Sequence, residues 1–483
     1  MTGFYLALTI PELLLGIFEH LSADGFIVAA LVCKAWSAPA VDTRWRTQMV
    51  PLSNLLAKLA PVNKNYGGIY AVIAPQTHIT QDHWNRFLEH YANRITKLYL
   101  NEQFDIGSLR FLSSLLGKFG GPFCNNLNSL NWPPNRVHNT ENHRELFDLL
   151  HATKLQTVRL GEDDTAPTGT ILLSQLAHRA THIREIVAPE QFNSFNFSAF
   201  PQLRSLSYRG RLSAPDFYNL ACCLHLRLLH LENMRVQVAT IHDNGVAVFP
   251  YLEEFRVDPS NDAADNMIMR SVMPALRSLE YRRYDMGPRT VPLLNGMIRT
   301  SPHLESISLT IGVSLSQLDL VRHDGVRNLF FNNWSEVRSE LGAKRLDLPI
   351  IARTFPKLET LYIRGHGTLK WLQTFASCLP HLRHLRLSLH VAISQLHGTS
   401  KEIAQIQSLT SLKFDVLSIR SVDIDRFINY LIKLCPNVRN MQVDCLWKLI
   451  EVKGGRRLAR VDGNGPAFVK RFFLLQRMRA FGI

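Results

Sequence analysis

Three closely spaced histidines are the first candidates for chemistry in this chain of 483 residues. His381, His384 and His390 lie in the stretch HLRHLRLSLH, which is typical of one extended segment. Side chains alternate between the two faces of a strand, so His384 and His390 share a face while His381 precedes the strand. This spacing does not converge on one ion as zinc ligands do, and we expect no metal site.

The sequence motifs of common catalytic centres are absent. There is no phosphate-binding Gly-Lys-Ser/Thr loop, no HExxH, no GxSxG and no CxxC pair. Most of the seven cysteines, including the adjacent Cys222 and Cys223, recur shortly before an apolar repeat position, as small packing residues would. Their odd number argues against a disulfide framework and favours the cytosol or nucleus. We therefore expect a chain that is not an enzyme and needs no cofactor.

A second candidate is a recognition cluster rather than a catalytic one. It combines one aromatic ring with basic side chains near the C-terminal end of the chain: Tyr362, Arg364, His384, Arg386 and Lys413. Guanidinium groups bind carboxylate and phosphate in a bidentate way, so the cluster suits an acidic or phosphorylated segment of a protein substrate. Asp415 and Asp444 lie nearby in the pattern, and the alternative is a solvated face with incidental charges.

These side chains can act together only if a repeated element places them on adjacent strands. The pattern L-x-x-L-x-L recurs along the chain, as in FPKLETLYI (355–363) and LPHLRHLRL (379–387). We call the first apolar residue of each copy its lead residue. The 14 lead residues are Ile95, Leu127, Leu155, Ile183, Leu203, Leu226, Leu252, Leu276, Leu304, Val326, Leu358, Leu382, Leu409 and Val438.

The lead residues lie on average about 26 residues apart. This period matches a leucine-rich-repeat solenoid, an α/β fold in which parallel strands stack into a horseshoe. Each copy predicts a short strand with one buried and one exposed face. The stretches 139–151, 213–224 and 421–435 are typical of helices between strands, with Ser213 and Ser421 as N-caps. The spacing is uneven, so we expect an irregular solenoid.

The N-terminus is apolar in a way that a helical end cap alone could explain. The stretch IPELLLGIFEHL (10–21) places Leu14, Ile17, Phe18 and Leu21 on one helical face. It has no preceding Lys or Arg, and Pro11-Glu12 interrupts it, so it is a poor signal peptide. No apolar run in the chain reaches the roughly 18 residues of a membrane span.

Three blocks in this region nevertheless fall in a specific order. After IPELLLGIFEHL come LVCKAW (31–36) and a final tryptophan, Trp45. This order resembles the F-box, with departures at Ile10-Pro11-Glu12, where a spacer is missing, and at Arg44, where Leu is usual. The matching residues are Pro11, Glu12, Leu14, Ile17, Phe18, Leu21, Val32, Cys33, Lys34, Trp36 and Trp45.

The resemblance implies a eukaryotic substrate receptor of the cullin–RING ubiquitin ligases. Its F-box would dock on a Skp-family adaptor, and its repeats would select an unknown protein substrate. The residues that the resemblance places on the adaptor surface are Pro11, Leu14, Ile17, Phe18, Leu21, Val32 and Trp36. Apolar surface exposed in the free chain would then be covered by this partner.

The sequence thus predicts four parts: a helical F-box (1–46), a connector and N-terminal cap (47–94), the repeats (95–450), and a basic C-terminal cap or tail (451–483). Half of the net charge of +14 lies in residues 452–483 and the rest of the chain is only mildly basic, so nucleic acid is not expected as a general partner. The alternative function is a leucine-rich-repeat scaffold outside the ligase. Its tail VKRFFLLQRMRAF (469–481) would bind an anionic membrane surface or RNA.

Overall fold

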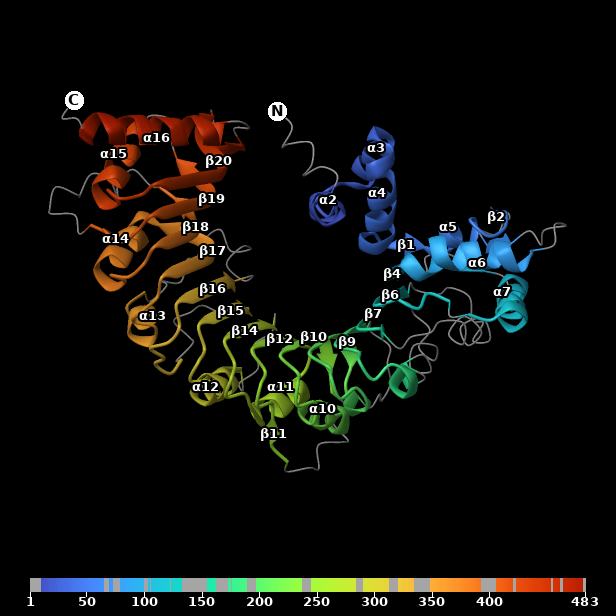
Figure 1. Cartoon of the computed structure of the whole chain (residues 1–483). Coiled ribbons are helices and arrows are strands. Elements are labelled where there is room, and N and C mark those ends of the chain that lie inside the picture. The colour runs from blue at the N-terminus through green and yellow to red at the C-terminus, as the bar shows by residue number, and fades with distance from the viewer. Residues whose placement is uncertain are drawn as a thin grey trace. The chain divides into compact units, whose positions relative to one another are not determined.

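The computed structural model describes residues 10–64, 69–72, 79–99, 103–104, 106–121, 123–132, 154–161, 173–174, 176–188, 197–236, 245–283, 290–311, 320–333, 348–391, 405–419, 423–452, 455–460 and 464–480. The chain forms two compact units, Met1–Thr240 and Ile241–Ile483. Each unit combines a run of parallel strands with helices, as Figure 1 shows.

The first unit begins with helices and continues into the sheet. Its described helices are α2 (Pro11–Phe18), α3 (Ala23–Val32), α4 (Lys34–Thr47), α5 (Leu52–Leu56), α6 (Gln81–His90), α7 (Ile106–Phe119) and α10 (Ala214–Ala221), with 3-10 turns η1 (Ala92–Arg94) and η3 (Phe197–Ala199). A small separate sheet contains β2 (Val62–Lys64), β3 (Ile69–Val72) and β5 (Gln103–Phe104).

The main strands of the first unit pair in chain order, all in parallel. They are β1 (Val50–Pro51), β4 (Lys97–Tyr99), β6 (Ser129–Trp132), β7 (Thr157–Leu160), β8 (Glu185–Ala188), β9 (Ser205–Arg211) and β10 (Leu228–Arg235). Parallel neighbours need a connection that returns along the outside of the sheet. The repeat supplies one such connection per strand.

The second unit continues the pattern with its own strands. They are β12 (Glu254–Pro259), β14 (Ser278–Arg283), β15 (Ser306–Ile311), β16 (Asn328–Asn333), β17 (Thr360–Thr368), β18 (His384–His390), β19 (Ser411–Ile419) and β20 (Asn440–Val452), paired in parallel, and β21 (Gly455–Arg460), which pairs antiparallel with β20. The short strands β11 (Ala247–Val248) and β13 (Ser271–Val272) pair separately.

Helices cover one side of these strands. The described helices of the second unit are α11 (Asp262–Met269), α12 (Thr290–Thr300), α13 (Leu348–Thr354), α14 (Leu369–Cys378), α15 (Ile424–Leu434) and α16 (Asn464–Ala480). In Figure 1, α13, α14 and α15 lie along one side of β16–β19. The opposite sheet face carries no described helix there; we call it the open face of the second unit.

The lead residues explain why the strands form where they do. All 14 are buried, none more than 2% exposed. Each is followed, two residues later, by the first residue of a main-sheet strand, from β4 after Ile95 to β20 after Val438. Within β15, Ile307 and Leu309 are buried while Ser306 and Ser308 are partly exposed. The prediction of a parallel-strand α/β solenoid after N-terminal helices is therefore confirmed.

Side-chain caps start helices of the first unit, and the cap at Ser213 is one that the sequence predicted. Ser213 caps α10, since its side chain accepts from the Asp216 N–H at 3.2 Å. Thr80 caps α6 in the same way through the His83 N–H at 3.3 Å. Ser421 and the expected helix over 139–151 lie outside the described residues. The helix α15, expected over 421–435, begins directly after Asp423.

The helix α4 is joined to the first repeat by side chains at its C-terminal end. Trp45 packs its ring edge-on against Tyr91 with centroids 5.6 Å apart. Asp42 contacts both Arg46 at 2.9 Å and Arg94 at 3.7 Å. Thr96 donates a hydrogen bond to the Arg46 carbonyl. These contacts fix the direction in which α4 leaves the repeats.

The C-terminal helix α16 packs on the last repeat. Its Phe468 and Phe472 are buried, and Phe468 lies 6.2 Å from Phe427 of α15, centroid to centroid. Gly465 lies so close to the Val443 carbonyl that a Cβ there would clash. The tail stretch is thus used, at least in part, as an end cap. Among the described helices, none is long and apolar enough to cross a membrane.

Candidate functional site

The N-terminal helices enclose a small core of their own. Leu14 and Phe18 of α2, Phe26 and Ala29 of α3, and Ala40 of α4 are all buried together. Trp36 packs against this core, with its ring edge-on to Phe18 at 5.6 Å between centroids. Both α2 and α3 pack on α4. The three helices therefore share a buried core, and the remaining apolar residues of α2 and α3 lie outside it.

The outer sides of α2 and α3 carry exposed apolar side chains. We call this set the N-terminal apolar face: Leu13, Ile17, Ile27, Val28, Leu31 and Val32. The exposed fractions range from 47% at Ile17 and Ile27 to 80% at Leu31. A helix that is apolar on all sides is normally buried on all sides. The sequence of α3, ADGFIVAALV, is of this kind, yet only one side of it is covered.

The residues expected on the adaptor surface divide between inside and outside. Ile17 and Val32 are exposed, at 47% and 57%. Leu21 and Trp36 are half-buried against the helical core. Pro11 starts α2, but its side chain lies outside what the structure describes.

Leu14 and Phe18, which are also expected on the adaptor surface, belong to the helical core of the free chain. Both are fully buried, because positions 14 and 18 are four apart on α2 and share the side that faces α4. Leu13 and Ile17, one position earlier, share the outer side. The residues that sequence reasoning missed are Leu13, Ile27, Val28 and Leu31. The unbroken apolar composition of α3 was the feature that could have indicated three of them.

The recognition cluster predicted near the C-terminal end lies on the open face of the second unit, and three of its five residues are direct neighbours there. Tyr362, Arg386 and Lys413 are register partners on β17, β18 and β19. The Arg386 guanidinium lies over the Tyr362 ring at 4.3 Å from its centroid. Phe330 on β16 adds an edge-on ring contact to Tyr362 at 6.3 Å. Three strands thus present two rings and a guanidinium side by side.

Carboxylates neighbour the basic groups of this cluster. Arg386 donates from Nε to Asp415 at 2.6 Å, and Lys413 lies 2.9 Å from Asp444. Burial raises the pKa of the Tyr362 hydroxyl, with the Asp415 charge as the next cause. The cluster is therefore a patch of aromatic rings and ion pairs. Because Asp415 and Asp444 partly neutralise its basic groups, it suits a purely anionic ligand less well than the sequence predicted.

The remaining members of the predicted cluster lie at its edges. Arg364 and His384 are exposed on β17 and β18. His381 precedes β18, and the His390 side chain lies outside the described residues. Within the described ranges, no group of three His, Cys, Asp or Glu side chains could hold a metal ion.

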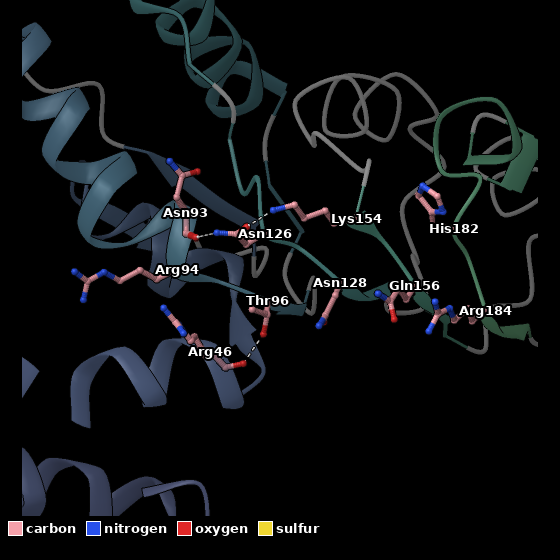
Figure 2. A pocket seen from close by; sticks show the side chains of 10 residues that line it. All are labelled: Arg46, Asn93, Arg94, Thr96, Asn126, Asn128, Lys154, Gln156, His182 and Arg184. Atoms are coloured by element: carbon pink, nitrogen blue, oxygen red, sulfur yellow. Dashed lines mark hydrogen bonds between the residues drawn. The ribbon is translucent and has the colours of Figure 1, made fainter. Parts of the chain in front are cut away.

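A third site, at the strand starts of the first unit, was not foreseen. It is a cavity of about 780 Å³, shown in Figure 2. Ten residues line it, with no acidic residue and no Phe, Tyr or Trp among them: Arg46, Asn93, Arg94, Thr96, Asn126, Asn128, Lys154, Gln156, His182 and Arg184. We call it the strand-start groove. Nine of its residues come from four consecutive repeats, and Arg46 comes from α4.

The comparisons with known proteins concern the fold. No protein-family model matches the chain, and no curated protein matches it in sequence. Among solved structures, it is similar to TLR13 in complex with ssRNA13, with TM-score 0.44 and 15% identity over 80% of this chain. This chain spans 50% of the length of that one.

Two further neighbours are named as leucine-rich-repeat proteins. One is LIC12759 of Leptospira interrogans, with TM-score 0.37 and 11% identity over 68% of this chain and 74% of that one. The other is the leucine-rich repeat domain of APL1B, with TM-score 0.28 and 13% identity over 80% and 89%. At these identities a likeness concerns the fold alone. The chain's own buried lead residues and parallel strands give it a leucine-rich-repeat fold.

Proposed function

We propose that this chain is the substrate-recognition subunit of a Skp–cullin–F-box ubiquitin ligase. In this proposal the N-terminal apolar face docks on a Skp-family adaptor. The repeats bind a protein substrate, and the chain itself supplies position rather than catalysis. Cytosol and nucleus are the compartments in which such a complex would work.

The observation that carries the proposal is the N-terminal apolar face. Six large apolar side chains on two short helices remain exposed, although the same helices bury a core on their other side. Such a surface marks a protein interaction site. The order of the three sequence blocks that resemble the F-box, Pro11–Leu21, Leu31–Trp36 and Trp45, falls on these helices and on α4.

The open face of the second unit supports a role in substrate binding. Interface hot spots are enriched in Tyr, Trp and Arg, held in place by neighbouring side chains. Tyr362 and Arg386 are held in this way by Phe330 and Asp415. The tail alternative has less in its favour, since Phe468 and Phe472 of α16 already pack on the last repeat.

The first prediction tests adaptor docking. Ile17→Asp combined with Leu31→Asp removes two apolar contacts and places two charges in the interface. Burying each such side chain contributes about 1.5–3 kcal/mol, so we expect adaptor affinity to fall by about a hundredfold or more. Affinity is measured by titrating purified Skp-family adaptor against the full chain.

Leu224→Asp is the matched control, because Leu224 is 60% exposed and lies among the repeats of the first unit. It should leave adaptor binding unchanged. Circular dichroism of each variant checks that the helices and strands remain folded. Full-strength binding by the Ile17 and Leu31 double variant would show that the proposed docking surface is wrong.

A further inference from the structure

The strand-start groove is built from one element repeated four times. In each of four consecutive repeats, two polar residues flank a buried lead residue. The pairs are Arg94 and Thr96 around Ile95, Asn126 and Asn128 around Leu127, Lys154 and Gln156 around Leu155, and His182 and Arg184 around Ile183. The lead residue anchors each pair, and the polar side chains on either side remain at the surface.

Backbone hydrogen bonds fix the spacing of these pairs. The Asn128 N–H donates to the Thr96 carbonyl at 2.9 Å, Gln156 to Asn128 at 2.8 Å, and Arg184 to Gln156 at 2.7 Å. Neighbouring strands in a sheet are about 4.8 Å apart, so the four repeats span roughly 14 Å. An extended peptide rises about 3.3 Å per residue, so this length matches about four residues.

The charge of the groove is positive and only partly compensated. Asp42, beside the groove, contacts Arg46 and Arg94. Lys154 donates to the side chain of Asn126 at 2.7 Å, a contact that leaves its charge in place. Arg184 is exposed and has no ion pair within the described part of the chain. The end of the groove away from α4 is therefore the more strongly cationic.

In the second unit, the same positions at the starts of β14 to β18 are neutralised instead. There Arg277 lies 3.4 Å from Glu305, and Glu359 lies 2.9 Å from Arg327 and 3.6 Å from Arg383. From β14 to β18, basic and acidic residues thus alternate from repeat to repeat. In the groove no glutamate or aspartate occupies any flanking position. The contrast shows that the fold itself does not require uncompensated cations at this edge.

Amide side chains decide which anionic ligand fits best. Asn128 and Gln156 lie in the middle of the groove, between the cations at its two ends (Figure 2). Each amide offers both a donor and an acceptor, which matches the N–H and C=O groups of a peptide backbone. A free polyphosphate offers only acceptors. Single-stranded nucleic acid usually stacks its bases on several aromatic rings, whereas no Phe, Tyr or Trp lines the groove and His182 supplies its one ring.

We propose that the strand-start groove binds an extended acidic segment of a protein, whose carboxylate or phosphate groups pair with Lys154 and Arg184 while Asn128 and Gln156 hold its backbone. This site is separate from the N-terminal apolar face and from the open face of the second unit. It does not depend on the function proposed above, because its binding can be measured without an adaptor.

Fluorescence anisotropy with the full chain tests this proposal. The probe is a labelled decapeptide of alternating Glu and Ser, compared with the same peptide carrying Gln in place of Glu. We expect the Glu peptide alone to bind, with an affinity that decreases as salt increases. A version with phosphoserine and Gln shows whether phosphate can replace carboxylate as the source of charge, and binding of either form supports the proposal.

The groove variant is Lys154→Glu with Arg184→Glu, both at exposed positions. It should weaken binding of the acidic peptide by about tenfold or more. The control variant, Lys433→Glu with Arg439→Glu, changes two exposed residues of the second unit and alters the net charge equally. It should change the affinity less than twofold.

Several results would overturn the proposal. They are equal losses in the groove and control variants, no binding of either acidic peptide, or groove-dependent binding of an oligouridine or of inositol hexakisphosphate that is tighter than that of the peptides. Tighter binding of oligouridine would assign the groove to nucleic acid, and tighter binding of inositol hexakisphosphate would assign it to a free polyphosphate.

Discussion

Burial separates the cysteine side chains into reactive and protected groups. Cys33 and Cys222 are exposed, whereas Cys124, Cys223 and Cys435 are buried. Burial raises the pKa of the Cys223 thiol to about 11, with Cys222 as a second cause, and that of Cys435 to about 12. The thiolate is the reactive form, so a raised pKa leaves very little of it at neutral pH.

We therefore predict that alkylation of the native chain at neutral pH modifies Cys33 and Cys222 first. The buried thiols of Cys124, Cys223 and Cys435 should react only when the chain unfolds. Peptide mapping by mass spectrometry after timed iodoacetamide treatment measures each site, and an unfolded sample in guanidinium provides the reference. Equal rates at Cys435 and Cys33 in the folded chain would contradict the assigned burial.

The sequence shows which residues are apolar, but it does not always predict whether an apolar residue faces the core or the solvent. Leu13 and Leu14 are adjacent and chemically identical, yet one is 50% exposed and the other fully buried. Only the position of α4 decides between them, and no pattern within α2 specifies that position. Likewise, the sequence places Arg386 and Asp415 near each other, but their 2.6 Å contact depends on side-chain geometry.

At the scale of elements, a buried ionic network joins α11 to the sheet. Asp265 of α11 is fully buried, accepts a hydrogen bond from the Tyr281 hydroxyl at 2.9 Å, and pairs with Arg283 of β14. Arg283 also reaches Asp262 at 2.5 Å, but Asp262 is 56% exposed. The two carboxylates share a partner and differ in burial.

We predict that Asp265→Ala destabilises the second unit by about 3–5 kcal/mol, because the buried Arg283 guanidinium keeps only the exposed Asp262 as a partner and the buried Tyr281 hydroxyl loses its acceptor. Asp262→Ala, the matched control on the same helix, should cost less than about 1 kcal/mol, since an exposed ion pair contributes little. Urea unfolding followed by circular dichroism measures both. Similar costs for the two variants would argue against a special role for the buried pair.

The main-sheet strands of the repeats were predictable because each lead residue must be buried. A chain that buries one apolar position per repeat has one register available, and strands follow each of the 14 positions. The two-residue strand β1 and the antiparallel β21 carry no such pattern and were missed. The strand-start groove was missed as well, since its residues align only through the backbone ladder.

For the molecule as a whole, the helices at the N-terminus and the repeats present separate surfaces of different chemistry. The N-terminal apolar face offers aliphatic side chains only. The open face of the second unit offers Tyr362, Arg386 and Phe330, and the strand-start groove offers cations and amides. A subunit that must hold two partners at once needs such a division, because similar surfaces would compete for the same partner.

This division leads to a prediction about substrate selection in cells. Tyr362→Ala with Arg386→Ala removes a stacked pair that has the character of an interface hot spot, so we expect substrate affinity to fall about tenfold or more. Adaptor binding should stay unchanged, because the N-terminal apolar face is untouched. Ubiquitin-remnant profiling compares cells that express the unchanged chain, this variant, or the Ile17 and Leu31 variant.

Remnant sites that depend on the unchanged chain should be lost in both variants, whereas the adaptor should co-purify only with the Tyr362 and Arg386 variant. Under the proposed function, the loss would arise for different reasons: one variant would not hold the substrate, and the other would not bind the adaptor. Lys433→Ala with Arg439→Ala, at exposed positions of the same unit, is the matched control and should preserve the profile. A profile that survives in the Tyr362 and Arg386 variant would place substrate binding elsewhere, with the strand-start groove as the next surface to test.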